Sequence, residues 1–394
     1  MKRITRIRCI VPFTRFSVHQ YGYCYSCCPS WTRLGHVGRL TSDISVMEIW
    51  NNQTMQYIRK AILKDELEKV CDFAIKNEYL DLAALKDDDD PNLNRVIEQI
   101  AAGEVVLDGP PHTFQVANSG RCNLKCTMCE SRDRFHKNDD GLDETLFNRI
   151  IPGILPKVSR LFLTGNGEVF FNPYSRKFLQ TLDSSQYPAL KIQILTNGIL
   201  LTPEFWETIR HHRFDSILVS VDAASKEVYQ SIRKNGSWDV LRRNLEFISE
   251  LRRQDLVSEF AINFIVMRSN YREMKDFVSL GLSLGCDRIF FQKIFGLADI
   301  RENINFTRDR KVLTEVADVL ADPIFSHPEV NTALVDEYRK YQGQSAGFWG
   351  NLVTKCIEGL LYYPIRAAFL TAKYLSLPWI HEIYELFRKK RVTG

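Results

Sequence analysis

Three cysteines lie within eight positions of this 394-residue chain, in the segment SGRCNLKCTMCESR. They are Cys122, Cys126 and Cys129, and the whole sequence contains ten cysteines. Spacings of four and three residues bring three sulfur atoms to one side of a tight loop. Three thiolates can bind three irons of a four-iron, four-sulfur cluster and leave the fourth iron open to an external ligand. An open iron indicates chemistry on a substrate or cofactor, whereas zinc sites commonly combine CxxC pairs with further Cys or His ligands.

The elements that must position this loop follow a regular pattern. Short apolar runs alternate with amphipathic stretches, and the runs are TFQVA (113–117), SRLFLT (159–164), KIQILT (191–196), DSILVSV (215–221), FAINFIV (260–266) and RIFFQKI (288–294). Helices are predicted over 203–211, with Thr202 as N-cap and Pro203 in the first turn, and over 237–253. Strands that alternate with helices predict an α/β fold, a partial (β/α)6 TIM-like barrel. In such barrels the chemistry lies at the carboxyl ends of the strands, where the cysteine loop begins.

The segment CNLKCTMC resembles the CxxxCxxC signature of the radical S-adenosylmethionine (SAM) superfamily, including an apolar residue, Met128, before the last cysteine. Three further motifs follow in the order of that family. They are LTGNGEVFFNP after the second strand, TNG after the third, and SVDAASKEVYQSIRKNGSW after the fourth. The resemblance covers roughly residues 113 to 295. It implies a 4Fe–4S cluster held by the three cysteines, with SAM chelating the open iron.

The resemblance also implies a set of SAM-binding residues. The glycines would let the backbone approach SAM, and the glutamate would accept a hydrogen bond from its ammonium group. The serine and aspartate would bind ribose hydroxyls or the carboxylate, and the arginine would pair with the carboxylate. An Asn-Gly pair is also a common turn, and the serine and aspartate are also common capping residues. The candidates are Gly165, Gly167, Glu168, Thr196, Asn197, Ser220, Asp222 and Arg233.

The activity implied by the resemblance is that of an oxidoreductase or modifying enzyme. One electron cleaves SAM at the cluster, and the resulting 5′-deoxyadenosyl radical abstracts a substrate hydrogen. The alternative is a noncatalytic iron–sulfur binding or electron-transfer protein, which would not cleave SAM. The substrate class stays open among small molecules, carbohydrates, lipid-linked compounds and peptides, because a fold does not choose between them. We expect a reductant such as flavodoxin or ferredoxin as a partner, and no nucleic acid.

A second group of cysteines lies near the N-terminus, in CIVPFTRFSVHQYGYCYSCCPSW and EKVCDFAIKNEYL. This stretch resembles the SPASM/twitch type of auxiliary iron–sulfur domain, placed here before the barrel. The ligands implied by that pattern are Cys9, Cys27 and Cys71, and the candidates to complete the set are Cys24 and Cys28. Lys76 stands where a further cysteine is often found. Either Cys24 or Cys28 completes the set, or the site is open to substrate, or the cluster has been lost.

We predict four parts in the chain. They are a Cys-rich auxiliary domain (1–84), a linker (85–112), the radical SAM partial barrel (113–300) and a helical C-terminal extension (301–394). The linker is predicted from the acidic run LKDDDDPNLN, which is typical of a solvated connection. With 45% hydrophobic residues, the chain can bury a large core.

The two ends of the chain are basic. Residues 1–47 carry a net charge of +6 and residues 340–394 carry +5. The net charge of the whole chain is only +4, so the residues between these ends are acidic on balance. This polarity suits an anionic substrate or surface. The C-terminal helices combine basic residues with apolar faces, as interfacial anchors do, although packing against the barrel would produce the same pattern. Without a secretory signal or a run of about 18 apolar residues, we expect a cytoplasmic protein, with peripheral membrane contact as an open alternative.

Overall fold

The computed structural model describes residues 3–29, 32–41, 43–72, 78–129, 142–164, 167–294, 301–304, 309–331, 334 and 338. Three expectations therefore lie outside the described residues: those for Gly165, for Lys76, and for the C-terminal helices with their membrane contact. In the described part of the chain, no helix is both long enough and apolar enough to cross a bilayer.

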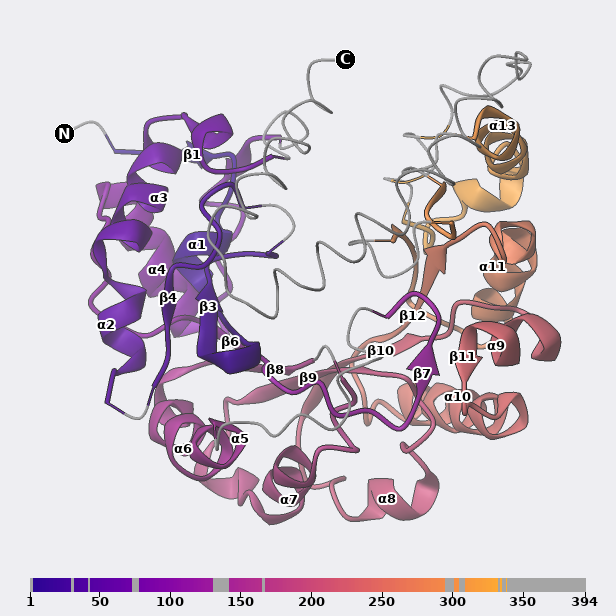
Figure 1. Cartoon of the computed structure of the whole chain (residues 1–394). Helices are drawn as coiled ribbons and strands as arrows, with labels where there is room; N and C mark the ends of the chain where they lie inside the picture. Colours follow the sequence, from indigo (N-terminus) through magenta and orange to yellow (C-terminus); the bar gives the residue numbers. More distant parts are fainter. Residues whose placement is uncertain are drawn as a thin grey trace.

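A parallel sheet forms the centre of the molecule (Figure 1). All six predicted strands are present, each is parallel to its neighbours, and their order in the sheet follows their order in the chain. They are β6 (Thr113–Ala117), β8 (Arg160–Leu163), β9 (Lys191–Thr196), β10 (Phe214–Ser220), β12 (Phe260–Val266) and β13 (Arg288–Lys293). The predicted α/β fold with a parallel sheet is confirmed.

The N-terminal segment extends this sheet. Strand β2 (Arg15–His19) pairs in parallel with β6, and β3 (Tyr23–Tyr25) and β4 (Gly38–Arg39) continue it antiparallel. The order is β13-β12-β10-β9-β8-β6-β2-β3-β4, and β13 and β4 are its two edges in the described part of the chain. The Cys-rich N-terminal segment and the candidate SAM-binding strands therefore belong to one open sheet.

The two faces of the sheet differ. Buried aliphatic residues such as Leu161, Ile192 and Ile194 line one face. Helices cover this face and lie outside the curved sheet in Figure 1: α7 (Pro173–Thr181), α8 (Pro203–Glu207), α10 (Trp238–Arg253) and α11 (Met274–Ser283). The residues that alternate with them, such as Gln193 and Ser216, are half-buried. Parallel sheets are usually covered on both faces, so a polar, partly exposed face is a candidate surface for a ligand.

Helix starts follow the predicted capping residues. The Thr202 hydroxyl accepts a hydrogen bond from the backbone N–H of Phe205 at 3.3 Å, and Ser237 accepts one from Val240 at 3.4 Å. Helix α10 agrees with the predicted span within one residue. Helix α8 ends at Glu207 and is followed by turns, so the helix predicted over 203–211 is too long.

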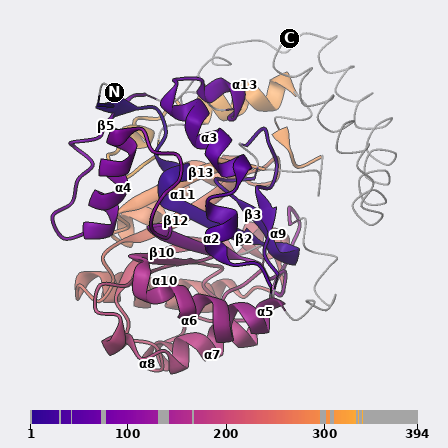
Figure 2. The ribbon, with the colours of Figure 1, turned by 90° about the vertical axis from the view of Figure 1, so that its left-hand side faces the viewer.

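Four helices pack around the N-terminal strands. They are α1 (Val11–Thr14), α2 (Val46–Trp50), α3 (Gln53–Leu63) and α4 (Pro91–Ala102). Figure 2 views the molecule from this side, with α2, α3 and α4 in front of the sheet. Phe16 of β2 contacts the Trp50 ring edge-on at 6.0 Å and stacks with Phe114 of β6 at 5.9 Å. These aromatic contacts join the N-terminal helices and the main sheet in one apolar core.

The central part of the predicted linker over 85–112 forms helix α4 in the structure. Asp90 is the N-cap and is only 6% exposed, because its carboxylate accepts from the backbone of Leu93 and contacts His112 at 2.7 Å and Ser159 at 2.9 Å. Burial alone would raise the pKa of Asp90, but these bonds hold it well below its usual range. Asp88 and Asp89 are exposed, as the local pattern indicates, whereas the burial of Asp90 depends on partners that are distant in sequence.

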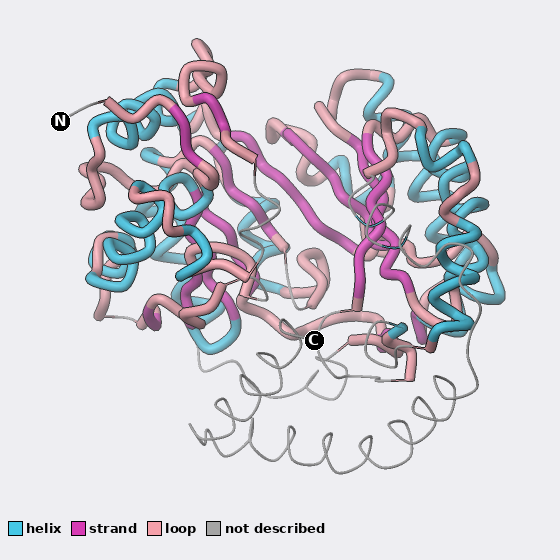
Figure 3. Tube along the Cα trace, turned by 90° about the horizontal axis from the view of Figure 1, so that it is seen from above, coloured by secondary structure: helices cyan, strands magenta, loops and turns pink. Residues whose placement is uncertain are grey.

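Short elements complete the described chain. They are β1 (Arg6–Ile7), which pairs with β5 (Leu80–Asp81), and the helices α5 (Leu142–Thr145), α6 (Ile151–Ile154), α9 (Lys226–Ile232) and α13 (Arg310–Val319). Seen from above, the strands run between two groups of helices (Figure 3).

Candidate functional site

The cysteine loop begins at the carboxyl end of β6 and is tied to a distant part of the chain. Strand β7 (Lys125–Cys126), inside the loop, pairs antiparallel with β11 (Arg233–Lys234). In this ladder Cys126 is the register partner of Arg233. The pairing fixes the middle cysteine of the triplet beside the arginine that the fourth motif contributes.

A small apolar cluster lies beneath the loop. Leu124 and Met128 are buried there against Ile232, Met267 and Ile294. The apolar residue before the last cysteine therefore anchors the loop from below. This arrangement leaves the cysteine sulfurs at the edge of a dry, packed region.

The three thiols lie close enough to influence one another. Cys126 is buried, whereas Cys122 and Cys129 are half-buried. The pKa of the Cys122 thiol is raised to about 12 and that of Cys126 to about 11; burial is the largest cause, and charge on neighbouring cysteines acts in the same direction. The guanidinium of Arg233, 3.7 Å from the Cys126 sulfur, acts in the opposite direction. Such buried thiols need a cation or a metal to become thiolates.

Gly167 allows the second motif to approach the cysteine loop. A β-carbon at this position would lie 2.2 Å from the carbonyl oxygen of Arg121, a distance that no real contact tolerates. The backbone N–H of Glu168 donates to the same oxygen at 2.7 Å. The glycine is therefore required by the packing of the motif on the loop.

The Glu168 carboxylate is 2% exposed and is held by the third motif. It accepts from the Thr196 hydroxyl at 2.6 Å, from the backbone N–H of Asn197 at 2.7 Å and from that of Phe170 at 3.3 Å. Burial raises its pKa above the usual range, against the effect of these donors. A carboxylate offers about four acceptor positions, so three protein donors leave room for about one more.

Asn197 joins the third motif to the cysteine loop. Its side-chain amide donates to Asn123 at 2.8 Å and lies 3.7 Å from the Cys122 sulfur. Thr196 and Asn197 therefore hold Glu168 and the loop in place. Their contacts are with the protein, which sequence reasoning did not distinguish from direct SAM contacts.

Asp222 and Arg233 form a buried ion pair. The carboxylate is fully buried, and it lies 2.5 Å from the Arg233 guanidinium and accepts from the backbone N–H of Ile265 at 2.8 Å. Burial alone would lower the pKa of Arg233, but the adjacent carboxylate raises it above its usual value. Both oxygens of Asp222 therefore have protein partners, and the carboxylate holds the Arg233 guanidinium in place.

Three buried polar atoms near this pair have no partner in the described part of the structure. They are the Tyr229 hydroxyl, the Arg233 Nε and the Asn263 Oδ1. Tyr229 lies within range of the charges of Arg233, Cys126 and Asp222. Asn263 is the register partner of the half-buried Ser220 on the next strand. Buried polar groups are rarely left unsatisfied, so these atoms indicate a ligand.

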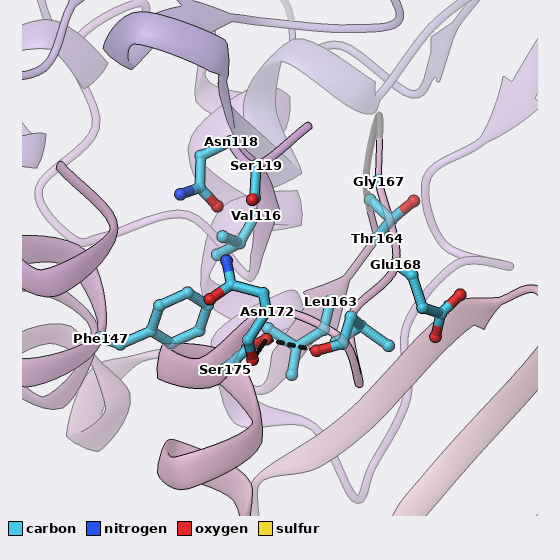
Figure 4. Close-up of a pocket in the computed structure, with 11 residues that line it drawn as sticks. Val116, Asn118, Ser119, Phe147, Leu163, Thr164, Gly167, Glu168, Asn172 and Ser175 are labelled. Carbon is cyan, nitrogen blue, oxygen red and sulfur yellow. Dashed lines mark hydrogen bonds between the residues drawn. The ribbon is translucent and has the colours of Figure 1, made fainter. Parts of the chain in front are cut away.

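A cavity of about 20 Å³ lies behind the Glu168 turn (Figure 4). Its lining includes Asn118 and Asn172, whose side-chain amides both donate to the buried carboxylate of Asp143. Figure 4 shows the Glu168 carboxylate pointing away from these asparagines. The space suits about one water molecule and is far too small for SAM.

The N-terminal cysteines form a second group. Charge on Cys71 raises the pKa of the Cys9 thiol, and Cys9, Cys28 and Cys71 all raise that of Cys27, although burial is the larger cause in both cases. The pKa of Cys9 rises to about 11 and that of Cys27 to about 12. The structure therefore brings together the three cysteines implied as auxiliary ligands.

Cys24 and Cys28 differ in their surroundings. Cys24 is fully buried in the apolar core on β3, and its thiol donates to the Gly22 carbonyl at 3.3 Å. Cys28 is exposed and adjacent to Cys27. Of the two candidates for completing the auxiliary set, the geometry favours Cys28, and Cys24 packs as a core residue.

Sequence reasoning missed several residues of the site. Tyr229 lies four positions before Arg233, so the two share one face near the end of α9, and this spacing was a detectable signal. Asn263 is a polar residue inside the apolar run FAINFIV, and a polar residue in a buried strand was a second detectable signal. Asp143 had no local signal, because its partners come from two other elements.

The described residues fit an iron–sulfur cluster and SAM. Among them, no three His, Cys, Asp or Glu side chains converge as the ligands of a single metal ion would. A cluster differs in this respect, because each thiolate binds a different iron and the sulfurs lie farther apart. Three cysteines on one loop, a buried carboxylate with spare acceptor capacity, and orphaned polar atoms beside them supply the donor set.

Family profiles match two regions of the chain. Residues 119–281 match the Radical SAM superfamily, and residues 9–72 match SPASM, an iron–sulfur cluster-binding domain. The chain thus carries both domains suggested by its cysteine motifs, with the SPASM domain first. The radical SAM domain implies a 4Fe–4S cluster and SAM, and the SPASM domain implies auxiliary iron–sulfur binding.

Curated relatives match about half of this chain. The mycofactocin maturase MftC of Mycobacterium tuberculosis is 27% identical over 199 residues, which is 48% of this chain and 46% of the relative. The AdoMet-dependent heme synthase of Methanosarcina barkeri is 25% identical over 206 residues, which is 51% of this chain and 56% of the relative. The chain thus spans about half the length of the curated relatives it matches.

Solved structures show a more distant similarity. Streptococcus suis SuiB bound to precursor peptide SuiA is 16% identical, with a TM-score of 0.44, over 78% of this chain and 69% of that chain. Native anSMEcpe with bound AdoMet and Kp18Cys peptide is 18% identical, with a TM-score of 0.41, over 60% of this chain and 69% of that chain.

Proposed function

We propose that this chain, which carries a radical SAM domain and an N-terminal SPASM domain, is an enzyme that modifies its substrate at a carbon–hydrogen bond. When bound, a reduced 4Fe–4S cluster with SAM supplies a 5′-deoxyadenosyl radical, which takes one hydrogen atom from the substrate. An electron donor such as flavodoxin or ferredoxin is part of the proposal. The observation that carries it is the cysteine loop, where the three thiols are neighbours and the β7–β11 ladder pairs Cys126 with Arg233.

We propose that Cys122, Cys126 and Cys129 hold the cluster. Arg233 supports this role, because its charge favours the thiolate form of Cys126. The apolar cluster beneath the loop keeps water from one side of the site. A dry site strengthens the electrostatic contacts within it and limits side reactions of a radical.

The methionine end of SAM would bind between the second and fourth motifs. Glu168 has about one acceptor position left for the SAM ammonium group, since Thr196, Phe170 and Asn197 occupy the others. The unpartnered Nε of Arg233 is a donor for the SAM carboxylate. Each group is buried, so each contact would be made without competition from water.

The adenosine part of SAM would lie along the carboxyl ends of β10 and β12. Ser220 offers a hydroxyl, and Asn263, its register partner, has an unpartnered carbonyl oxygen. Ribose hydroxyls both donate and accept, so they suit this pair. Asp222 holds Arg233, and its remaining acceptor positions suit a ribose hydroxyl.

We propose a substrate class on the basis of the relatives. Because they include a maturase, a peptide is the first class to test, ahead of carbohydrates, lipid-linked compounds and other small molecules. We further propose that the six parallel strands act as a partial (β/α)6 barrel over 113–300, with residues 1–84 as the auxiliary part. The order of the strands and the helices outside them support this arrangement.

The test measures SAM cleavage without oxygen. Reconstituted protein, SAM and dithionite should release 5′-deoxyadenosine, and Cys126→Ala should abolish the release. Cys286→Ala is the matched control, because Cys286 is buried in the core away from the loop, and it should retain activity. Cleavage by the Cys126 variant would refute the proposal, and cluster absorbance without cleavage in the unmodified protein would favour a noncatalytic iron–sulfur protein.

A further inference from the structure

Arg15 begins β2, and its side chain lies on the sheet face that the outer helices leave uncovered. Phe16 and Val18 point the other way, into the core, and are fully buried. The Arg15 guanidinium lies 5.9 Å from the ring centre of Phe162 on β8. Both side chains therefore share the half-buried face, two strands apart.

The Arg15 guanidinium has no hydrogen bond or ion pair among the residues that the structure describes. Two other arginines of the same face do have partners. Arg160 lies 3.1 Å from the Asp215 carboxylate, and Arg288 is paired with Glu259. Arg15 therefore differs from these two arginines, which lie on the same face and have carboxylate partners.

The Arg15 side chain is half-buried, and its guanidinium nitrogens are not fully buried. Burial lowers the pKa of Arg15, and the nearby thiols of Cys27 and Cys28 act in the opposite direction. The guanidinium stays charged in such a position. Its planar fork of five N–H donors matches the geometry of a carboxylate or a phosphate.

Next to Arg15 on this face, Thr113, Ser17 and Phe162 are neutral, and Arg160, across Thr113 in register, is already paired with Asp215. Ser17 donates to the Gln115 side chain at 3.0 Å, and Phe162 presents its ring. None of the neutral groups can neutralise an anion. An anionic ligand on this part of the face would therefore bind at Arg15, while its uncharged part would face hydroxyl and amide groups.

We propose that Arg15 binds an anionic group, a carboxylate or a phosphate, of the substrate. This inference rests on the proposed function. Strand β2 runs from Arg15 to His19, the register partner of Ala117, where the cysteine loop begins. Four residues of a strand span about 13 Å. A substrate anchored at Arg15 would thus extend along the strands toward the candidate cluster, and the auxiliary cysteines would lie at its anchored end.

The experiment uses the full chain with its clusters, handled without oxygen. Binding of inorganic phosphate and of acetate is measured by calorimetry, and the anion that binds identifies a phosphorylated or a carboxylate-bearing substrate. Arg15→Gln should weaken that binding at least about tenfold, the effect of removing a charge-assisted hydrogen bond. Arg288→Gln is the matched control from the same face and should bind like the unmodified protein. Iron content and SAM affinity are measured for each variant.

Three results would overturn the inference. One is that neither anion binds the unmodified protein, and another is that Arg15→Gln binds as well as the control. The third is that Arg15→Gln loses iron while anion binding is unchanged, which would show that Arg15 balances the auxiliary thiolates. If neither the unmodified protein nor the variants bound SAM, while anion binding still depended on Arg15, the proposed function would be contradicted and the anion site would remain.

Discussion

Replacing Asp222 by Asn tests the buried ion pair beside the cysteine loop. The substitution is nearly isosteric, and asparagine tolerates the positive φ of 64° at this position. The new amide oxygen can still accept from the Ile265 N–H, now 2.8 Å from the carboxylate. The change therefore removes one charge and leaves the Arg233 guanidinium buried without a counterion.

The expected loss of stability is large. Breaking a buried ion pair from one side costs about 3–5 kcal/mol, and the retained hydrogen bond places this variant near the lower value. With a urea dependence of about 3 kcal/mol per molar, the unfolding midpoint would fall by about 1 M. The measurement is urea unfolding of cluster-loaded protein in the absence of oxygen, and the unfolding is monitored by circular dichroism.

A surface pair provides the control. Lys226 and Asp239 lie 2.7 Å apart, but both side chains are largely exposed, and such pairs contribute little. Asp239→Asn should leave the midpoint unchanged. If Asp222→Asn and Asp239→Asn had equal midpoints, the reasoning about the buried pair would be refuted.

Three further predictions follow from the structure. Gly167→Ala should lower iron content, because its β-carbon would meet the Arg121 carbonyl at 2.2 Å, whereas Gly153→Ala should not, because that position is open; equal iron contents would contradict the packing argument. Cys27→Ser should remove auxiliary iron and Cys24→Ser should not, since only Cys27 lies with Cys9 and Cys71; loss of iron in both would restore Cys24 as a ligand. Burial lowers the pKa of His212 to about 4, so the unfolded chain takes up this proton first, near pH 6.5, and stability should fall as pH drops from about 6.5 toward 4. His212→Gln should flatten that dependence in unfolding measured across this range, and an unchanged slope would show that other groups cause it.

The strands of the sheet were predictable because each carries its own pattern. Runs such as KIQILT alternate in side-chain burial with a period of two, and all six predicted strands are present. Strand β2 escaped notice because five residues between short turns provide little periodicity. Its place beside β6 depends on Phe16 stacking with Phe114, ninety-eight positions away.

The sequence alone determined the kind of chemistry at the site, since the spacing of Cys122, Cys126 and Cys129 and the order of the later motifs are local properties of the chain. The tertiary structure decided the partners. It placed Arg233 against Cys126, provided protein partners for both oxygens of Asp222, and left Arg15 without an ion pair among the described residues. Hydrogen bonds and ion pairs depend on distances between atoms that are remote in sequence, and these distances exist only once the strands have packed.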